Sequence, residues 1–266
     1  MEALLAETGN CSSQLALPPS EAHIWYAWTA DCDTPALRAY YRSLLNEEEC
    51  ARLERFAFEY LKLEYLATRA LCRTVLSAYA SVSPAHWQFE ANSYGRPEIA
   101  TSGTPAPLRF NLSNARSLVA CVVTREVDAG IDVEELDRRG ETVSIANHYF
   151  SPLELHALHA LPPERQRHRF FELWTLKESY IKARGMGLSI PLDQFSFCLE
   201  APPISVILDP RLGDIATDWQ FQLYRLSDRH LVAVCIRRAQ PPDFRIHIRE
   251  VVPDTRLRWR NAPCGF

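Results

Sequence analysis

Hydrophobic residues recur at three- and four-residue spacings in two long parts of the chain. The first part runs from Pro35 to about Ala80, and the second comprises "SPLELHALHAL" and "ERQRHRFFELWTLKESYIKARG". That spacing places apolar side chains on one face of an α-helix. We therefore expect two or three helices in the first part and further helices in the second.

Short apolar segments rich in aromatic and β-branched residues predict the strands. The first is "HIWYAWTA", and the first helical part is followed by "HWQFEANSYGRPEIA", "RFNLS", "SLVACVVT" and "AGIDVEELD". The strands after the second helical part are "FSFCLE", "ISVILD", "WQFQLYRL", "HLVAVCIRR" and "FRIHIREVV". Helices followed by strands occur twice, which predicts an α+β fold of two similar halves.

The boundaries of these halves follow from the same pattern. Residues 1–20 mix small polar residues with a double proline and are predicted to be a flexible leader. We place the N-terminal half at 21–130, the C-terminal half at 131–252 and a tail at 253–266. Without a flexible linker near the boundary, the halves should pack against each other, and clefts between halves are common ligand sites.

Composition limits the classes of function. The chain has 266 residues, 47% of them hydrophobic, which is enough for a substantial core. Its 29 basic and 33 acidic residues give a formal charge of -4, which argues against a general nucleic-acid binder or a polybasic membrane-surface protein.

The expected location is the cytoplasm. The amino terminus has no basic segment typical of a secretory signal, and no run of eighteen apolar residues predicts a membrane span. The eight cysteines form no CxxC pair and no cluster with zinc-site spacing, so we expect reduced, mostly structural thiols.

The segment "GIDVEELD" offers two carboxylates on one face of a strand. Alternation directs Asp132 and Glu134 to the same side and Ile131 and Val133 into a core. Paired carboxylates on a rigid backbone suit a hard cation such as Mg²⁺. Taken alone, the segment is explained better as a solvated strand face.

The segment "WTLKESYIKARG" (174–185) combines acid and base on one predicted helix. Glu178 and Lys182 are four residues apart, which by itself is an ordinary stabilising ion pair. Trp174 and Ile181 should anchor the helix in the core, and Lys177 and Lys182 are expected to reach from beside Glu178 into an adjacent cleft.

Three further segments offer weaker signals. "FNLSNA" (110–115) has backbone N–H groups and short polar side chains suited to phosphate or amide groups. "YGRP" has the turn residues of a hairpin, and its Arg96 is equally explained as a surface charge. Arg69 and Arg73 recur on one helical face, where a grip on phosphate competes with the commoner solvated face.

In combination, these segments resemble the larger, two-halved 4'-phosphopantetheinyl transferases of the type that activates surfactin synthetase. The resemblance rests on "GIDVE" followed some forty residues later by "WTLKESYIKARGMGLSIPLDQFSF", with "YGRP" and "FNLSNA" upstream. It implies two similar α+β halves related by a pseudo-two-fold axis, with coenzyme A and Mg²⁺ in the cleft between them. It also implies transfer of phosphopantetheine from coenzyme A to a carrier-protein serine, with release of 3',5'-ADP.

The resemblance also assigns roles to residues. Asp132, Glu134 and Glu178 would bind Mg²⁺, with Mn²⁺ as an alternative, and Glu178 would be the general base beside the catalytic residues Asp132 and Lys182. The residues implied in binding coenzyme A are Lys62, Arg69, Arg96, Asn111, Ser113, Asn114, Lys177 and Lys182.

One position departs from the family pattern. Many relatives have histidine where this chain has Asn114, and asparagine cannot shuttle a proton near neutral pH. A mechanism with the base at that position is therefore disfavoured, which gives Glu178 more weight.

The expected partner is an acyl or peptidyl carrier protein, with no nucleic acid and no membrane. Arg165, Arg167 and Arg169 lead into two phenylalanines and form either a docking surface or a solvated basic face. Fatty-acid, polyketide, nonribosomal-peptide and aminoadipate-reductase carriers all remain open, and we expect a monomer because two halves suffice for one cleft. The alternative function is a non-catalytic module that binds coenzyme A or a carrier protein.

Overall fold

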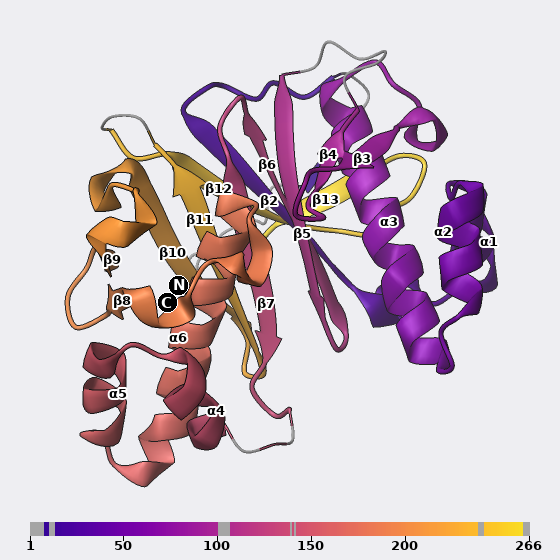
Figure 1. Cartoon of the computed structure of the whole chain (residues 1–266). Coiled ribbons are helices and arrows are strands. Elements are labelled where there is room, and N and C mark those ends of the chain that lie inside the picture. Colours follow the sequence, from indigo (N-terminus) through magenta and orange to yellow (C-terminus); the bar gives the residue numbers. More distant parts are fainter. Residues whose placement is uncertain are drawn as a thin grey trace, which may run out of the picture. The chain divides into compact units, whose positions relative to one another are not determined.

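The structure is a computed structural model, and it describes residues 8–10, 14–100, 107–138, 140, 142–238 and 242–262. Helices and strands are mixed throughout, which confirms the predicted α+β class (Figure 1). The chain divides into two compact units. The first comprises Met1–Glu90, Pro97–Glu126 and Arg245–Gly265, and the second Ala91–Arg96 and Val127–Phe244.

The first unit is built on a six-stranded sheet. Its strands, in spatial order, are β1 (Thr8–Asn10), β13 (Arg258–Asn261), β12 (Arg245–Val251), β2 (Glu21–Trp28), β6 (Leu118–Arg125) and β5 (Leu108–Ala115). The pair of β12 and β2 is parallel, and the other neighbours are antiparallel. Parallel pairing requires a long connection, and here the whole second unit lies between these strands in the sequence.

Three helices complete the first unit. They are α1 (Pro35–Ser43), α2 (Glu47–Glu54) and α3 (Glu59–Tyr79). Asn46 begins α2 with a capping box, which explains why the helical pattern is divided here. Helix α3 packs on the sheet, and its Leu71 and Val75 share a core with Trp25 of β2 (Figure 1).

The second unit is built on the antiparallel sheet β10–β11–β7. These strands are β10 (Trp219–Ser227), β11 (His230–Arg237) and β7 (Ala129–Glu135), and a separate pair is β8 (Phe195–Cys198) with β9 (Ser205–Leu208). The helices are α4 (Thr142–Tyr149), α5 (Pro152–His159) and α6 (Pro163–Arg184). Helix α6 packs on β7 and β11, where Phe170, Leu176 and Tyr180 enter the core. The sequence did not predict α4, which spans little more than two turns.

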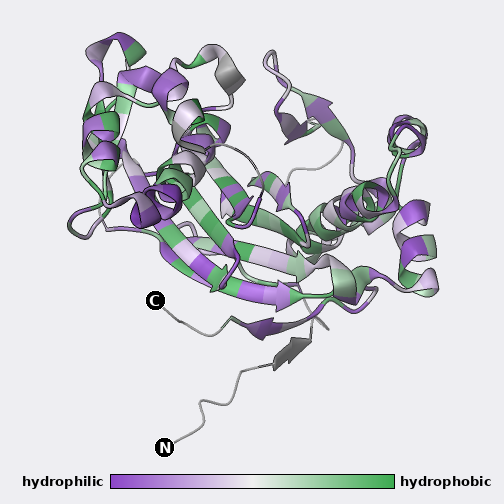
Figure 2. Cartoon of the chain, turned by 90° about the horizontal axis from the view of Figure 1, so that it is seen from below, coloured by the Kyte–Doolittle hydropathy of each residue, from purple (hydrophilic) through white to green (hydrophobic). Residues whose placement is uncertain are grey.

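A short hairpin connects α3 to β5 in the sequence. Its strands are β3 (Phe89–Ala91) and β4 (Pro97–Ile99), and its tip, Ala91–Arg96, is grouped with the second unit. In Figure 2 the strands of the main sheets carry long hydrophobic segments. This agrees with the burial of β6 and β11, in which every residue except the last is buried.

The division of the chain differs from the predicted one at both ends. The sequence prediction assigns β12 to the C-terminal half and 253–266 to a tail, but β12 pairs with β2 and the tail contains β13. The predicted leader is partly packed, because the Leu15 N–H donates to the Ala78 carbonyl over 2.7 Å and Leu17 is buried. Residues 1–7, 11–13 and 263–266 of the leader and tail lie outside the described part of the chain.

Two other sequence expectations concern cysteines and membrane spans. Within the described residues the six cysteines are free thiols, four of them buried, and Cys11 and Cys264 lie outside that range. None of the helices described is long and apolar enough to cross a membrane.

Candidate active site

Gly130 allows helix α6 to lie directly against strand β7. A Cβ atom at this position would lie 2.0 Å from the Ser179 carbonyl oxygen and 2.4 Å from the Ala183 nitrogen. Asp132 and Glu134 follow Gly130 at two-residue steps, so all three share the strand face that α6 covers. The first residue of the "GIDVE" segment therefore sets the distance between the two elements of the site, a role that the sequence analysis missed.

Lys182 and Glu178 approach these carboxylates from α6. The Lys182 Nζ atom lies 2.7 Å from Oδ1 of Asp132, and Asp132 is buried. Burial raises the pKa of Glu178, and repulsion by Asp132 raises it further, while attraction to Lys182 acts in the opposite direction. The structure thus brings Asp132, Glu178 and Lys182 into one electrostatic cluster.

Glu134 is the most perturbed carboxyl of this cluster. Burial, together with the charge of Asp132, raises its pKa to about 7. Arg138, 3.3 Å away, Lys182 and a hydrogen bond from Trp174 oppose this shift. The raised pKa shows that the charged form of Glu134 is disfavoured, first by burial and then by the neighbouring charge of Asp132. This hydrogen bond gives Trp174 a second role besides its expected one as an anchor in the core.

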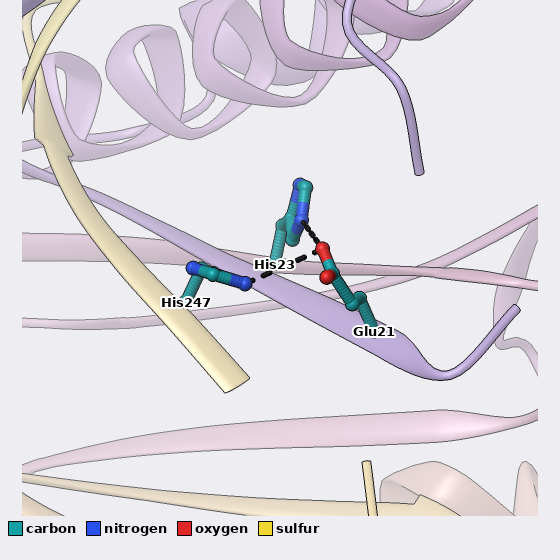
Figure 3. Close-up of side chains that lie close together, drawn as sticks. All are labelled: Glu21, His23 and His247. Atoms are coloured by element: carbon teal, nitrogen blue, oxygen red, sulfur yellow. Dashed lines mark hydrogen bonds and ion pairs between the residues drawn. The ribbon is translucent and has the colours of Figure 1, made fainter. Parts of the chain in front are cut away.

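The donor set fits a hard divalent cation. Asp132, Glu134 and Glu178 supply carboxylate oxygens. Burial and then repulsion by Asp132 raise the pKa values of Glu134 and Glu178, and a bound cation would offset that repulsion. Their ligand atoms are not grouped within 4.8 Å of one another, and Lys182 lies against Asp132. Among the described residues, the three ligands that lie within 4.8 Å of one another are instead Glu21, His23 and His247 (Figure 3).

Lys177 does not join the cluster, which disagrees with its predicted contact with phosphate. Its ammonium group is fully buried and lies 2.8 Å from Glu154. It also donates to the carbonyl oxygens of Leu192 and Phe195, each over 2.7 Å. These three partners match the three donors of an ammonium group, so Lys177 ties α6 to α5 and to the segment before β8.

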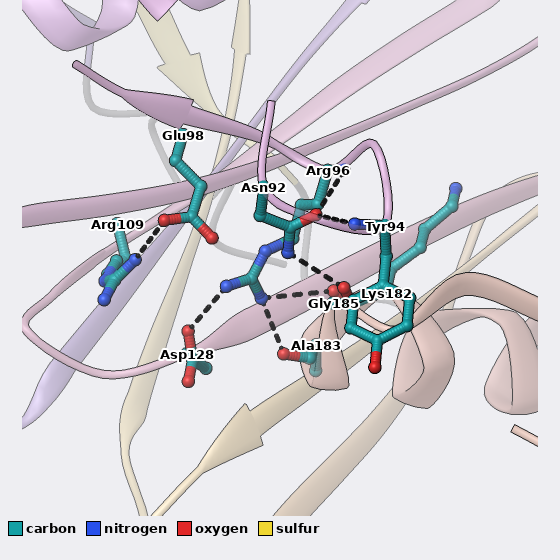
Figure 4. Close-up of polar contacts among 9 residues, drawn as sticks. All are labelled: Asn92, Tyr94, Arg96, Glu98, Arg109, Asp128, Lys182, Ala183 and Gly185. Atoms are coloured by element: carbon teal, nitrogen blue, oxygen red, sulfur yellow. Dashed lines mark hydrogen bonds and ion pairs between the residues drawn. The ribbon is translucent and has the colours of Figure 1, made fainter. Parts of the chain in front are cut away.

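Arg96 lies at the carboxyl end of α6 rather than beside the carboxylates. Its guanidinium donates to the Ala183 carbonyl over 2.8 Å and to Asp128 over 3.2 Å (Figure 4). Gly185 ends the helix with a φ of +65°, and Asn92 donates to its carbonyl. Arg96 thus compensates the partial negative charge of the helix end, so its predicted grip on a nucleotide phosphate disagrees with these contacts.

The remaining predicted residues belong to the first unit. Arg69 lies 3.6 Å from Glu49 and over the Tyr65 ring, and Lys62 pairs with Glu59 at 2.8 Å. Arg73, the neighbour of Arg69 on the predicted phosphate-binding face, is buried and donates to Glu49.

The segment "FNLSNA" is part of β5. Its residues pair with β6 as far as Ala115. Asn111 and Ser113 are buried on this strand, whereas Asn114 is exposed.

Comparison with known proteins identifies the family. Over 176 residues the chain is 33% identical to the "4'-phosphopantetheinyl transferase HetI" of Nostoc sp., an alignment that covers 66% of this chain and 73% of the relative. The chain belongs to the 4'-phosphopantetheinyl transferases. Residues 128–235, which contain β7 and α6, match the family described as "4'-phosphopantetheinyl transferase superfamily".

Two other relatives support this phosphopantetheinyl transferase assignment. A "4'-phosphopantetheinyl transferase" of Bacillus subtilis is 35% identical over 65% of this chain and 72% of its own length. The "L-aminoadipate-semialdehyde dehydrogenase-phosphopantetheinyl transferase" of Mus musculus is 25% identical over 85% of this chain and 79% of its own length. The family predicted from the four sequence segments is thereby confirmed.

Proposed function

We propose that this phosphopantetheinyl transferase moves the 4'-phosphopantetheine arm of coenzyme A to a serine hydroxyl of an acyl or peptidyl carrier protein and releases 3',5'-ADP. The observation that carries the proposal is the cluster of Asp132, Glu134, Glu178 and Lys182 at the contact of β7 and α6. Buried carboxylates beside a lysine supply oxygen ligands for a metal ion and a positive charge for a phosphate, which are the groups that metal-assisted phosphoryl transfer uses.

The proposed ligands of Mg²⁺, or of Mn²⁺ in its place, are Asp132, Glu134 and Glu178. When bound, the ion supplies positive charge beside the pyrophosphate of coenzyme A. Lys182 then turns from Asp132 and donates a hydrogen bond to a phosphate oxygen, which stabilises the negative charge that develops there.

Glu178 acts as the general base in this proposal. It accepts the proton of the carrier serine, whose oxygen bonds to the phosphorus that bears the pantetheine arm. The bond from that phosphorus to the oxygen of 3',5'-ADP breaks at the same time. Burial raises the pKa of Glu178, which makes its carboxylate a better base than an exposed glutamate.

Coenzyme A contacts are also proposed in the first unit. Lys62, Arg69, Ser113 and the exposed Asn114 remain candidates there, whereas the buried Asn111 would act through its backbone. Lys177 and Arg96 are left out of the binding site because their polar groups are bonded within the fold.

Of the three arginines predicted to contact the carrier protein, two are engaged in contacts within the fold. Arg165 is exposed. Arg167 donates to the Leu136 carbonyl over 3.1 Å, and Arg169 lies 2.9 Å from Glu172. Arg165 is therefore the first of the three to test for contact with an acidic carrier protein.

The test is intact-mass spectrometry of apo carrier proteins incubated with this protein, coenzyme A and Mg²⁺. The expected result is a gain of one phosphopantetheine on the carrier, which EDTA prevents and excess Mg²⁺ restores. Binding of coenzyme A without any gain, across several acyl and peptidyl carriers, would favour the non-catalytic module instead.

A further inference from the structure

A second group of metal-ligand side chains lies in the first unit, on the parallel strands β2 and β12. His247 is paired directly with His23 in this ladder, and Glu21 precedes His23 by two residues. Alternation places Glu21 and His23 on one face of β2, and Figure 3 shows His247 directed toward the same point. Oε2 of Glu21 lies 3.2 Å from Nε2 of His23 and 3.3 Å from Nε2 of His247.

Both imidazoles present their Nε2 atoms to Glu21. His23 is 2% exposed, and burial together with the charge of Arg249 lowers its pKa to about 4. Nε2 of His247 is buried and makes no hydrogen bond to the described residues, although Glu21 lies beside it. A neutral histidine is the form that binds a metal ion, and an unsatisfied buried nitrogen is costly unless a ligand is supplied.

The other ring nitrogen of His23 determines how a metal ion would be accepted. Nδ1 receives a hydrogen bond from Arg249 over 2.8 Å and lies 2.6 Å from the Tyr79 hydroxyl. Since arginine only donates, the proton of neutral His23 is on Nε2 in this arrangement. Metal binding at Nε2 requires the proton on Nδ1, and the Nδ1–H group can then donate a hydrogen bond to the Tyr79 hydroxyl oxygen once Arg249 withdraws.

We propose that Glu21, His23 and His247 bind a divalent transition-metal ion such as Zn²⁺ and thereby fasten β12 to β2. Two imidazoles and one carboxylate select borderline ions over Mg²⁺, which prefers oxygen ligands. The positive charges of Arg245, near Glu21, and of Arg249, near His23, repel a cation. An ion that binds here therefore needs coordination by the imidazole nitrogens and not only electrostatic attraction. An ion that binds only the folded chain would raise its stability.

The first test uses Co²⁺ as a spectroscopic probe, with the metal-free full-length chain in excess Mg²⁺. We expect one saturable equivalent with the visible absorption of nitrogen–oxygen coordination, and a rise in Tm when Zn²⁺ is added. His247→Ala and Glu21→Gln should each weaken Co²⁺ binding by at least about tenfold. His86→Ala, which removes an exposed histidine of the same unit, should leave binding unchanged.

The second test uses the competing arginine. Arg249→Leu keeps an apolar side chain against the Trp25 and Trp259 rings but removes the donor to Nδ1 of His23. We expect tighter Co²⁺ binding in this variant. Unchanged Co²⁺ affinity in folded His247→Ala and Glu21→Gln, or no saturable binding by the unmodified chain, would overturn the proposal. Neither readout depends on transferase activity.

Discussion

The ammonium group of Lys182 lies 2.7 Å from a carboxylate oxygen of Asp132, at the contact between α6 and β7. This pair neutralises one acid of a cluster in which Glu134 and Glu178 keep raised pKa values. The cluster therefore has more acidic than basic side chains in a buried place, which favours binding of a divalent cation. The raised pKa of Glu178 also suits this carboxylate to accept a proton.

Replacement of Glu178 tests the proposed base. Glu178→Gln preserves the shape of the side chain and cannot accept the serine proton, so we expect a rate loss of about 10²–10⁴ in carrier modification. The rate is measured by intact mass at saturating coenzyme A and Mg²⁺. Glu172→Gln, on the same helix and paired with Arg169, is the matched control. A loss below about tenfold in Glu178→Gln would assign the base elsewhere.

The raised pKa of Glu134 predicts a dependence of stability on pH in the absence of metal. Its pKa of about 7 exceeds the ordinary 4.5, so the folded chain binds this proton more tightly than the unfolded chain. Its contribution to the free energy of unfolding therefore falls as pH rises from 4.5 to about 7. As pH rises across that window, the free energy of unfolding of Glu134→Gln should increase by roughly 2–4 kcal/mol relative to that of the unmodified chain.

Urea unfolding with EDTA at about pH 5 and about pH 8 measures this difference. Glu135→Gln is the control, because Glu135 neighbours Glu134 on β7 but pairs with Arg229 at 2.5 Å. The stability of Glu134→Gln is compared with that of the unmodified chain at each pH. The same difference at both pH values would mean that the pKa of Glu134 is not raised in the folded state.

Gly130→Ala should separate α6 from β7. The added methyl group would lie 2.0 Å from the Ser179 carbonyl oxygen, so we expect a loss of several kcal/mol in the free energy of unfolding. In the control Gly95→Ala, the added methyl group would have no atom within 4 Å. The loss in the free energy of unfolding should then be only about 1–2 kcal/mol, from the strain of a φ of +89°. Equal losses in the two variants, measured by urea unfolding, would show that α6 does not depend on close approach at Gly130.

Lys177→Met tests the reassignment of this lysine from phosphate contact to a structural role. Removing one partner of the buried pair with Glu154 should cost about 3–5 kcal/mol of stability. Coenzyme A affinity, measured by calorimetry on the folded variant at low temperature, should be nearly unchanged. Undiminished stability with a tenfold weaker affinity would restore the phosphate contact.

The sequence predicted the fold class and the pattern of local elements well because these depend on short-range periodicity. Alternation along "GIDVE" and the four-residue spacing of Glu178 and Lys182 indicated which side chains share a face. The partner of Lys177 could not be predicted in this way, because Glu154 belongs to a different helix and forms a buried ion pair with it. The contacts of Arg96 with Asp128 and Ala183 were not predicted either, because they depend on tertiary packing.

The pairing of β12 with β2 was the largest difference from the predicted organisation. More than two hundred residues separate these strands, and nothing in the local pattern of "FRIHIREVV" indicates which strand it joins. The same long-range pairing brings His247 beside His23, so the histidine–glutamate group on these strands could be found only in the structure.

In the proposed function, the acids on the α6-facing side of β7 serve phosphopantetheine transfer. A comparison of Asp132→Asn with Glu135→Gln, two buried acids of the same strand, tests this role. The rate of apo-to-holo carrier conversion is measured by intact mass with coenzyme A and Mg²⁺. We predict a loss of about 10²-fold or more for Asp132→Asn, since the lost charge stabilisation is several kcal/mol, and a change within about threefold for Glu135→Gln. Full activity of folded Asp132→Asn would show that this carboxylate does not serve the transfer.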